Sequence, residues 1–165
     1  ALLEAFPDAQ IVYVVRRPEE SIRSFLAFTE RFVAPLLKEG ELPVYFRRKY
    51  RWCVELYRRF EELRPRIPPE QLLVLRFDEI TKAPEAALRR FFEFSAIDPE
   101  EETIERISAK RNSRPAKRHV NDALAVFGIT EEEVRRDLAF VRERYFPEDI
   151  DDEPAPTAEL GGVGS

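Results

Sequence analysis

Two short apolar runs, each followed by a helical pattern, constrain the fold of this chain more than any other feature. Residues 11–15 (IVYVV) and 72–77 (LLVLRF) are short, continuous and rich in aliphatic side chains, which is typical of strands buried on both faces of a sheet. Strands that alternate with helices pair in parallel and build doubly wound sheets. The sequence therefore predicts a helix-rich α/β fold with a partial doubly wound parallel sheet.

Helical patterns and their stops account for most of the remaining chain. Pro18 suits the first turn of a helix, and apolar residues recur on one face of the segment that follows it. A capping-box pattern begins at Thr130 and has a glutamate three residues later. We predict helices over residues 18–37, 44–64, 84–94, 98–110 and 130–145.

Two strands alone make a poor sheet, because both edges and both faces need cover. We therefore expect a further strand upstream. The chain begins with alanine and contains no methionine, which also favours the interpretation that it is the C-terminal portion of a longer protein. We expect the isolated chain to be marginally stable or to self-associate.

Residues 147–165 differ from the rest of the chain in composition. They contain six acidic residues and no lysine or arginine, together with several prolines and glycines, which predicts a disordered acidic tail after a domain over residues 1–146. Without the six tail acids, the total of 32 acidic residues falls to 26 against 27 basic ones. A body so close to neutral argues against a general nucleic-acid-binding protein.

The counts of cysteine and histidine exclude several kinds of site. The single cysteine, Cys53, excludes an internal disulfide, and its place in a helical pattern favours a buried structural thiol over a reactive one. The single histidine, His119, cannot build a histidine-rich metal site, so no metal is expected. No apolar run approaches the roughly 18 residues of a membrane span, and no signal peptide is visible, which favours a cytoplasmic location.

The segment 16–24 (RRPEESIRS) predicts an anion-binding pocket at the end of the first strand. Helix N-termini attract phosphate because their first amide groups are unpaired and the helix dipole is positive there. Arg16 adds a fork of donors at the strand end, and Ser24 adds a hydroxyl two turns into the helix. The alternative from residue chemistry alone is that both are ordinary surface residues.

Residues 6–24 resemble a motif of the nucleotide-dependent sulfotransferases, F-P-[DN]-A-[KR]-h-h-h-h-h-R-x-P-x-x-x-x-x-S, in which h is apolar. The matching residues are Phe6, Pro7, Asp8, Ala9, Arg16, Pro18 and Ser24. Residues 68–94 resemble a second block of that family, a strand ending in R-[YF]-E-D-L followed by D-P-x-x-x-h-x-x-h-h-x-F. The two blocks stand in the family's order and cover residues 6–97.

The resemblance implies a P-loop-like fold of the broad bacterial sulfotransferase type. It implies an enzyme that moves a sulfuryl group from 3′-phosphoadenosine 5′-phosphosulfate to an acceptor hydroxyl or amine. In that family the arginine and the serine hold the 3′-phosphate of the donor, a role the resemblance assigns to Arg16 and Ser24. Arg17 and Ser21 are further candidates for contact with the nucleotide, and the aromatic residues of 44–64 are expected to pack in the core, an acceptor pocket being the alternative.

The chain also departs from the family's pattern. The glycine-containing loop that cradles the phosphosulfate has no counterpart, so we expect the isolated chain to be inactive. Residues 110–119 are basic without any acidic residue, and Arg111 and Arg114 are candidates for closing over the nucleotide, the alternative being a solvated loop. The catalytic base is not identified, because His119 lies outside the matching motifs.

Two other functions remain open. The chain could be a non-catalytic, partner-binding module with a sulfotransferase-like fold, or another P-loop nucleotide enzyme such as a kinase. Nucleotide selectivity separates these functions. A sulfotransferase portion should prefer adenosine 3′,5′-bisphosphate, a kinase should prefer ATP, and a binding module should bind neither.

Overall fold

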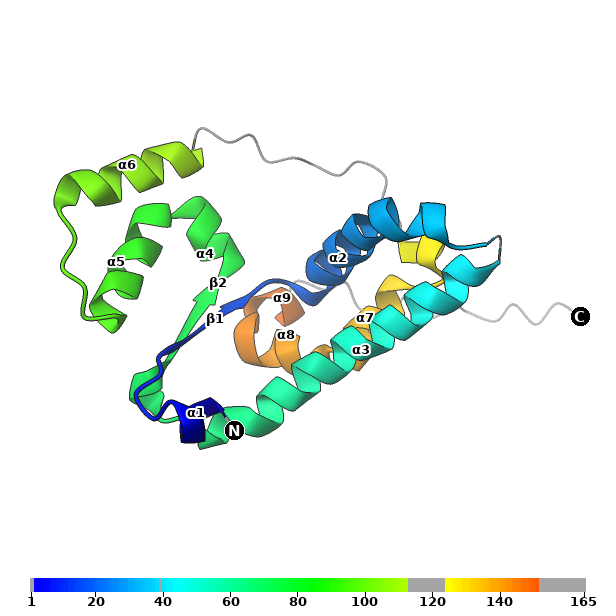
Figure 1. The fold of residues 1–165 in the computed structure, drawn as a ribbon, viewed down its shortest axis with the longest axis horizontal. Coiled ribbons are helices and arrows are strands. Elements are labelled where there is room, and N and C mark those ends of the chain that lie inside the picture. The colour runs from blue at the N-terminus through cyan, green and yellow to red at the C-terminus, as the bar shows by residue number, and fades with distance from the viewer. Residues whose placement is uncertain (1, 39, 113–123, 152–165) are drawn as a thin grey trace, which may run out of the picture.

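A two-stranded parallel sheet lies near the centre of the computed structural model, which describes residues 2–38, 40–112 and 124–151 (Figure 1). β1 (Ile11–Val15) and β2 (Leu72–Arg76) pair in parallel, with Ile11 opposite Leu72 and Val15 opposite Arg76. The prediction of two parallel strands separated by helices is confirmed. Their parallel pairing brings both carboxyl ends, and the residues that follow them, to the same edge of the sheet.

Figure 1 shows a group of helices on each side of the sheet. On one side lie α2 (Pro18–Val33), α3 (Glu41–Leu63), α7 (Glu131–Asp137) and α8 (Ala139–Tyr145). On the other side lie α4 (Phe77–Lys82), α5 (Pro84–Phe94) and α6 (Glu101–Asn112). The short elements are α1 (Leu2–Ala5), α9 (Glu148–Asp151) and the 3₁₀ turns Ala34–Leu36, Arg64–Arg66, Pro69–Gln71 and Leu124–Phe127.

Helix starts follow local chemistry, although α2 ends at Val33 and α6 begins at Glu101, which differ from the predicted bounds of 37 and 98. α3 begins at Glu41, three residues before the predicted start at residue 44. The helix can include Pro43 because a proline in the first turn gives up no helical hydrogen bond. Gly40 precedes the helix with a φ of 87°, a conformation that favours glycine. The capping box at Thr130 is confirmed, since its hydroxyl accepts from the amide of Glu133 at 3.0 Å. The single helix predicted after it is divided into α7 and α8 at Leu138, which is fully buried.

The main core lies between α2, α3, α7, α8 and one face of the sheet. α2 contributes Ile22 and Leu26, which are 1% and 0% exposed, and α3 contributes Phe46 and Tyr50 at 2% each. Cys53 belongs to the same cluster, and its burial raises the pKa of the thiol to about 11. The prediction of a buried thiol is confirmed, and α2 is held firmly along its inner face.

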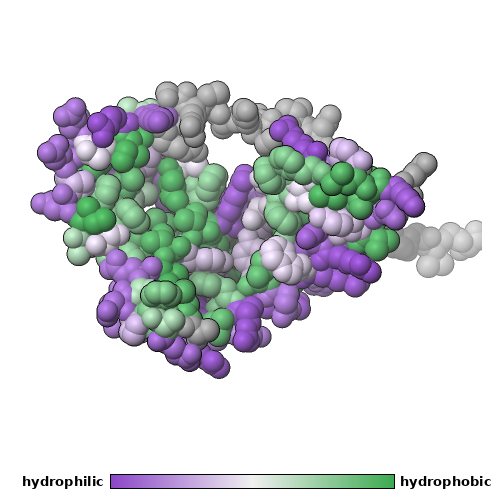
Figure 2. Space-filling model, viewed as in Figure 1, coloured by the Kyte–Doolittle hydropathy of each residue, from purple (hydrophilic) through white to green (hydrophobic). Residues whose placement is uncertain are grey.

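The opposite face of β1 is not buried, which contradicts the prediction for this strand. Val12 and Val14 are 36% and 48% exposed, whereas Val15 is 1% exposed. In Figure 2 apolar side chains gather over the central part of the viewed face, around the sheet. Within the described residues the sheet has two strands, as the sequence predicted, and this face of β1 is left only partly covered.

α9 lies beyond Pro147, where the sequence predicted a disordered tail. Its acidic residues Glu148 and Asp149 form ion pairs with Arg76 and Arg17, so residues up to Asp151 are helical where disorder was predicted, and the domain boundary at residue 146 stays a prediction. Residues 152–165 lie outside the described part of the chain. None of the described helices has the length and apolarity needed to cross a membrane.

Candidate functional site

The site begins where β1 passes into α2. Val15 ends the strand, Arg16 and Arg17 follow, and Pro18 opens the helix. Arg17 occupies the N-cap position, but its side chain does not cap the helix. The first amide groups of α2 therefore have no side-chain acceptor and add a partial positive charge at this edge of the sheet.

Two contacts hold the guanidinium group of Arg16. Its Nε donates a hydrogen bond to Oε2 of Glu20 at 3.0 Å. Its guanidinium carbon lies 4.8 Å from the ring centroid of Phe77, the first residue after β2. The side chain is 35% exposed, so Arg16 is ordered and still accessible to a ligand.

Arg17 faces a different set of groups. Its Nε and Nη2 donate to the two carboxylate oxygens of Asp149 at 2.6 and 3.0 Å, and its Nη1 donates to Asp78 at 3.4 Å. The hydrogen bond to Asp149 raises the pKa of Arg17 above its ordinary value. In this structure carboxylates therefore occupy both donor edges of Arg17, whereas among the described residues Arg16 donates to a carboxylate only through its Nε.

The carboxyl end of β2 carries an ion-pair network that the sequence analysis did not identify. Arg76 donates from Nε and Nη2 to Asp78 at 3.1 and 2.8 Å and also pairs with Glu148. The ring of Phe146 lies 4.7 Å from the guanidinium carbon of Arg76 and 5.1 Å from that of Arg17. The hydrogen bond from Arg76 lowers the pKa of Asp78 to about 2.

Two adjacent carboxylates, Asp78 and Glu79, lie at the start of α4, and Glu79 also pairs with Arg90. The helix-capping carboxylate at the start of α4 is that of Glu79, which accepts from the amide of Arg76 at 3.3 Å. Asp78 is instead the ion-pair partner of Arg76 and Arg17. Asp78 precedes Glu79 by one residue, so local sequence alone does not decide which carboxylate turns toward the amide.

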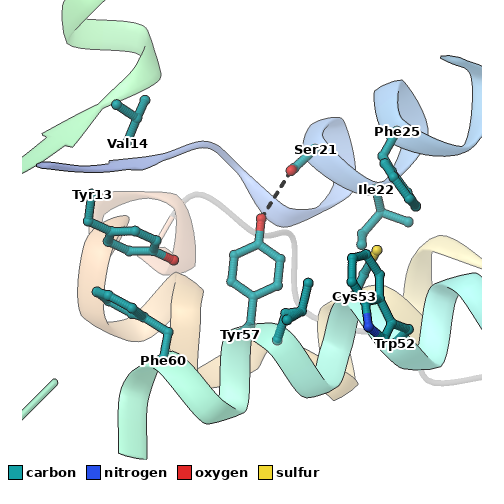
Figure 3. A pocket seen from close by; sticks show the side chains of 10 residues that line it. Tyr13, Val14, Ser21, Ile22, Phe25, Trp52, Cys53, Tyr57 and Phe60 are labelled. Atoms are coloured by element: carbon teal, nitrogen blue, oxygen red, sulfur yellow. Dashed lines mark hydrogen bonds between the residues drawn. The ribbon is translucent and has the colours of Figure 1, made fainter. Parts of the chain in front are cut away.

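The two serines of α2 are three residues apart and lie on neighbouring parts of the helix surface. Ser24 is half-buried and lies one helical turn after Glu20. Arg16 precedes the helix and reaches Glu20 through the hydrogen bond from its Nε. Ser21 instead accepts a hydrogen bond from the hydroxyl of Tyr57 at 3.0 Å (Figure 3). The structure links Arg16 to α2 through Glu20 and directs Ser21 toward α3, and the joint role of Arg16 and Ser24 stays a prediction.

A pocket of about 280 Å³ opens between β1, α2 and α3 (Figure 3). Aromatic side chains form most of its wall, and the Ser21–Tyr57 hydrogen bond supplies its polar part. Burial raises the pKa of Tyr57, while the nearby charge of Arg16 opposes that rise. The aromatic residues of α3 thus divide between the core, where Phe46 and Tyr50 lie, and this pocket, which Trp52, Tyr57 and Phe60 line.

The remaining candidates lie at or beyond the end of α6. Arg111 belongs to the last turn of α6, but its side chain is outside the described part, as are Arg114 and His119 entirely. Their assignment to the nucleotide site stays a prediction. Among the described residues, no group of three histidine, cysteine or acidic side chains is arranged to hold a metal ion.

Comparison with known proteins identifies the class. The model of the sulfotransferase family matches residues 1–102, and the chain belongs to this family. Among solved structures, the chain is similar to sulfotransferase STF9 from Mycobacterium avium, with a TM-score of 0.71 and 24% sequence identity. The match covers 88% of this chain and 38% of that one, so the chain spans well under half of the solved protein's length. No curated protein matches significantly.

These findings confirm the family resemblance and the fold class predicted from the sequence. The fold is a helix-rich α/β arrangement of the P-loop-like type found in sulfotransferases. The matched region contains both β1 and β2 with their carboxyl ends, and therefore Arg16, Ser24, Arg76 and Asp78.

Proposed function

We propose that this chain carries the 3′-phosphate-binding part of a sulfotransferase that uses 3′-phosphoadenosine 5′-phosphosulfate. The sulfuryl group would pass to an acceptor hydroxyl or amine, leaving adenosine 3′,5′-bisphosphate. The observation that carries the proposal is the place of Arg16, which Glu20 and Phe77 hold just before the start of α2, beside the carboxyl ends of both strands. Open α/β sheets bind their ligands at that edge.

The groups around the start of α2 suit a phosphate group. The guanidinium of Arg16 can donate two parallel hydrogen bonds to phosphate oxygens, and the hydroxyl of Ser24 can donate a third. The N-terminal amides of α2 add a fixed partial positive charge. These groups bind and orient the donor by its 3′-phosphate, so their contribution is to specificity. The catalytic base is not assigned to any residue of this chain.

Calorimetric titration tests this function. We expect the folded chain to bind adenosine 3′,5′-bisphosphate more tightly than 5′-AMP or ATP, because only the bisphosphate presents a 3′-phosphate to Arg16 and Ser24. Equal binding of the bisphosphate and 5′-AMP would contradict the 3′-phosphate role. A preference for ATP would favour a kinase-like enzyme. A folded chain that binds none of the three nucleotides would favour a partner-binding module.

A further inference from the structure

Glu20 lies between the two residues proposed to bind the 3′-phosphate. It lies four residues after Arg16, which precedes the helix, and one helical turn before Ser24, and its side chain is 46% exposed. A carboxylate in this place would repel an incoming phosphate if it acted only through its charge. Its hydrogen bond to Arg16 points to a different role.

The geometry of the Arg16 guanidinium shows which of its donors are occupied. A guanidinium group has an Nε edge, an outer edge formed by Nη1 and Nη2, and two flat faces. Glu20 accepts from Nε at 3.0 Å, and the ring of Phe77 lies near the guanidinium carbon at 4.8 Å. Neither Nη1 nor Nη2 bonds to any residue that the structure describes.

Arg17 provides an internal comparison. Its Nε and Nη2 bond to Asp149 and its Nη1 bonds to Asp78, so carboxylates take both of its edges. In Arg16 a carboxylate takes only the Nε edge. The difference leaves Arg16 with the paired donors that match two phosphate oxygens.

We propose that Glu20 is a positioning residue for 3′-phosphate recognition, an inference that rests on the proposed function. By holding Nε, Glu20 fixes the rotation of the guanidinium plane, and Phe77 limits its tilt. The outer edge of Arg16 is then oriented before the ligand arrives, and the carboxylate and the phosphate bind opposite edges of one guanidinium. Preorganised donors avoid the entropy cost of ordering a flexible arginine on binding.

Two substitutions separate positioning from charge. Glu20→Gln keeps an oxygen that can accept from Nε but removes the charge, and Glu20→Ala removes the acceptor. We expect the Gln variant to bind adenosine 3′,5′-bisphosphate within about twofold of wild type or more tightly, and the Ala variant to bind about three- to tenfold more weakly. Binding of 5′-AMP should change in neither variant. Glu85→Ala removes a carboxylate with the same four-residue spacing to an arginine, Arg89, on another helix, and should leave bisphosphate binding unchanged.

Nuclear magnetic resonance of the arginine Nε–Hε groups gives a second measurement that needs no ligand. We expect slow exchange of the Arg16 Hε proton in wild type and in Glu20→Gln, and fast exchange in Glu20→Ala. If both variants bind the bisphosphate more tightly, Glu20 acts only as a repulsive charge and the positioning role is wrong. If wild type binds the bisphosphate selectively and both variants bind equally well, only the role of Glu20 is contradicted. If wild type does not bind it, the proposed function is contradicted and this role with it.

Discussion

Arg16 and Arg17 are consecutive residues with similar exposure, yet their surroundings give them different roles. Their side chains are 35% and 29% exposed. Arg16 contacts Glu20 on its own helix and Phe77 across the sheet edge, whereas Arg17 bonds to carboxylates from α4 and α9. We therefore expect Arg16 to act on ligand binding and Arg17 to act on stability.

Substitution of each arginine tests this division. Arg16→Ala should weaken binding of adenosine 3′,5′-bisphosphate by about 1.5–3 kcal/mol, the usual size for hydrogen bonds to a charged group, and should leave 5′-AMP binding almost unchanged. Arg17→Ala should lower the free energy of unfolding, because it leaves Asp149 without its partner. Calorimetry and urea denaturation of both variants measure the two effects. An equal loss of both ligands in Arg16→Ala would contradict the assignment.

The lowered pKa of Asp78 predicts a dependence of stability on acid. Its pKa is about 2 in the folded chain, below its ordinary value of 3.8, because Arg76 and Arg17 stabilise the ionised form. A group with a lowered folded-state pKa stabilises the fold above its ordinary pKa, and this contribution is lost as the pH falls toward the folded value. Wild type should therefore lose stability between about pH 4 and pH 2 more steeply than Asp78→Asn, as measured by urea denaturation at a series of pH values. If the stability of wild type and of Asp78→Asn falls in parallel over that range, the ion pairs of Asp78 do not stabilise the fold.

At the scale of elements, the short helix α9 joins the carboxyl ends of both strands. Asp149 bonds to Arg17, the second residue after β1, Glu148 pairs with Arg76, the last residue of β2, and the ring of Phe146 lies close to both arginines. The composition of residues 147–165 indicated disorder because it is acidic and poor in apolar residues. α9 is ordered because its charges meet opposite charges, which composition does not reveal.

Asp149→Asn tests the contribution of α9. The change removes one charge of a pair whose side chains are 29% and 23% exposed, so we expect a loss of about 1–2 kcal/mol in the free energy of unfolding. The segment from Phe146 onward should also become more sensitive to protease, which limited proteolysis with mass spectrometry can locate. Glu62→Gln is the control, because its pair with Arg59 on α3 is 61% and 64% exposed and should contribute little. Equal effects of the two changes would argue against a specific role for α9.

At the scale of the whole molecule, burial is uneven. The core between α2, α3, α7 and α8 contains residues with no exposure, such as Leu26 and Val141, whereas one face of β1 presents Val12 and Val14 to solvent. An apolar strand face without cover favours association between molecules. We therefore expect the predicted self-association to use this face.

Two threonine substitutions test whether the open face of β1 drives association. Val14→Thr keeps the shape and strand propensity of a β-branched residue but makes the exposed face more polar, so it should reduce self-association in sedimentation velocity experiments without unfolding the chain. Val15→Thr, one residue later, places a hydroxyl at a position that is 1% exposed and should instead destabilise the fold by about 1–3 kcal/mol. Unchanged sedimentation of Val14→Thr would show that another surface mediates association.

The elements were largely predictable from the sequence because their signals are local. The continuous apolar runs specify β1 and β2, Pro18 and Pro84 mark helix starts, and Thr130 with Glu133 forms a cap within four residues. The motif from Arg16 to Ser24 is local in the same sense, so it indicated the candidate site before the fold was known. The helix break at Leu138 was missed because it coincides with a fully buried side chain, which is a tertiary feature.

By itself, the sequence determined the order of strands and helices and the family to which the chain belongs, because periodicity, turn chemistry and motif spacing act over a few residues. Only the tertiary structure decided which of two adjacent arginines keeps its donors available. The partners of Arg17 lie 61 and 132 residues away, at Asp78 and Asp149, and Phe77 reaches Arg16 from the end of the other strand. Such pairings arise when parallel strands bring their carboxyl ends together, since the side chains that meet there come from distant parts of the chain.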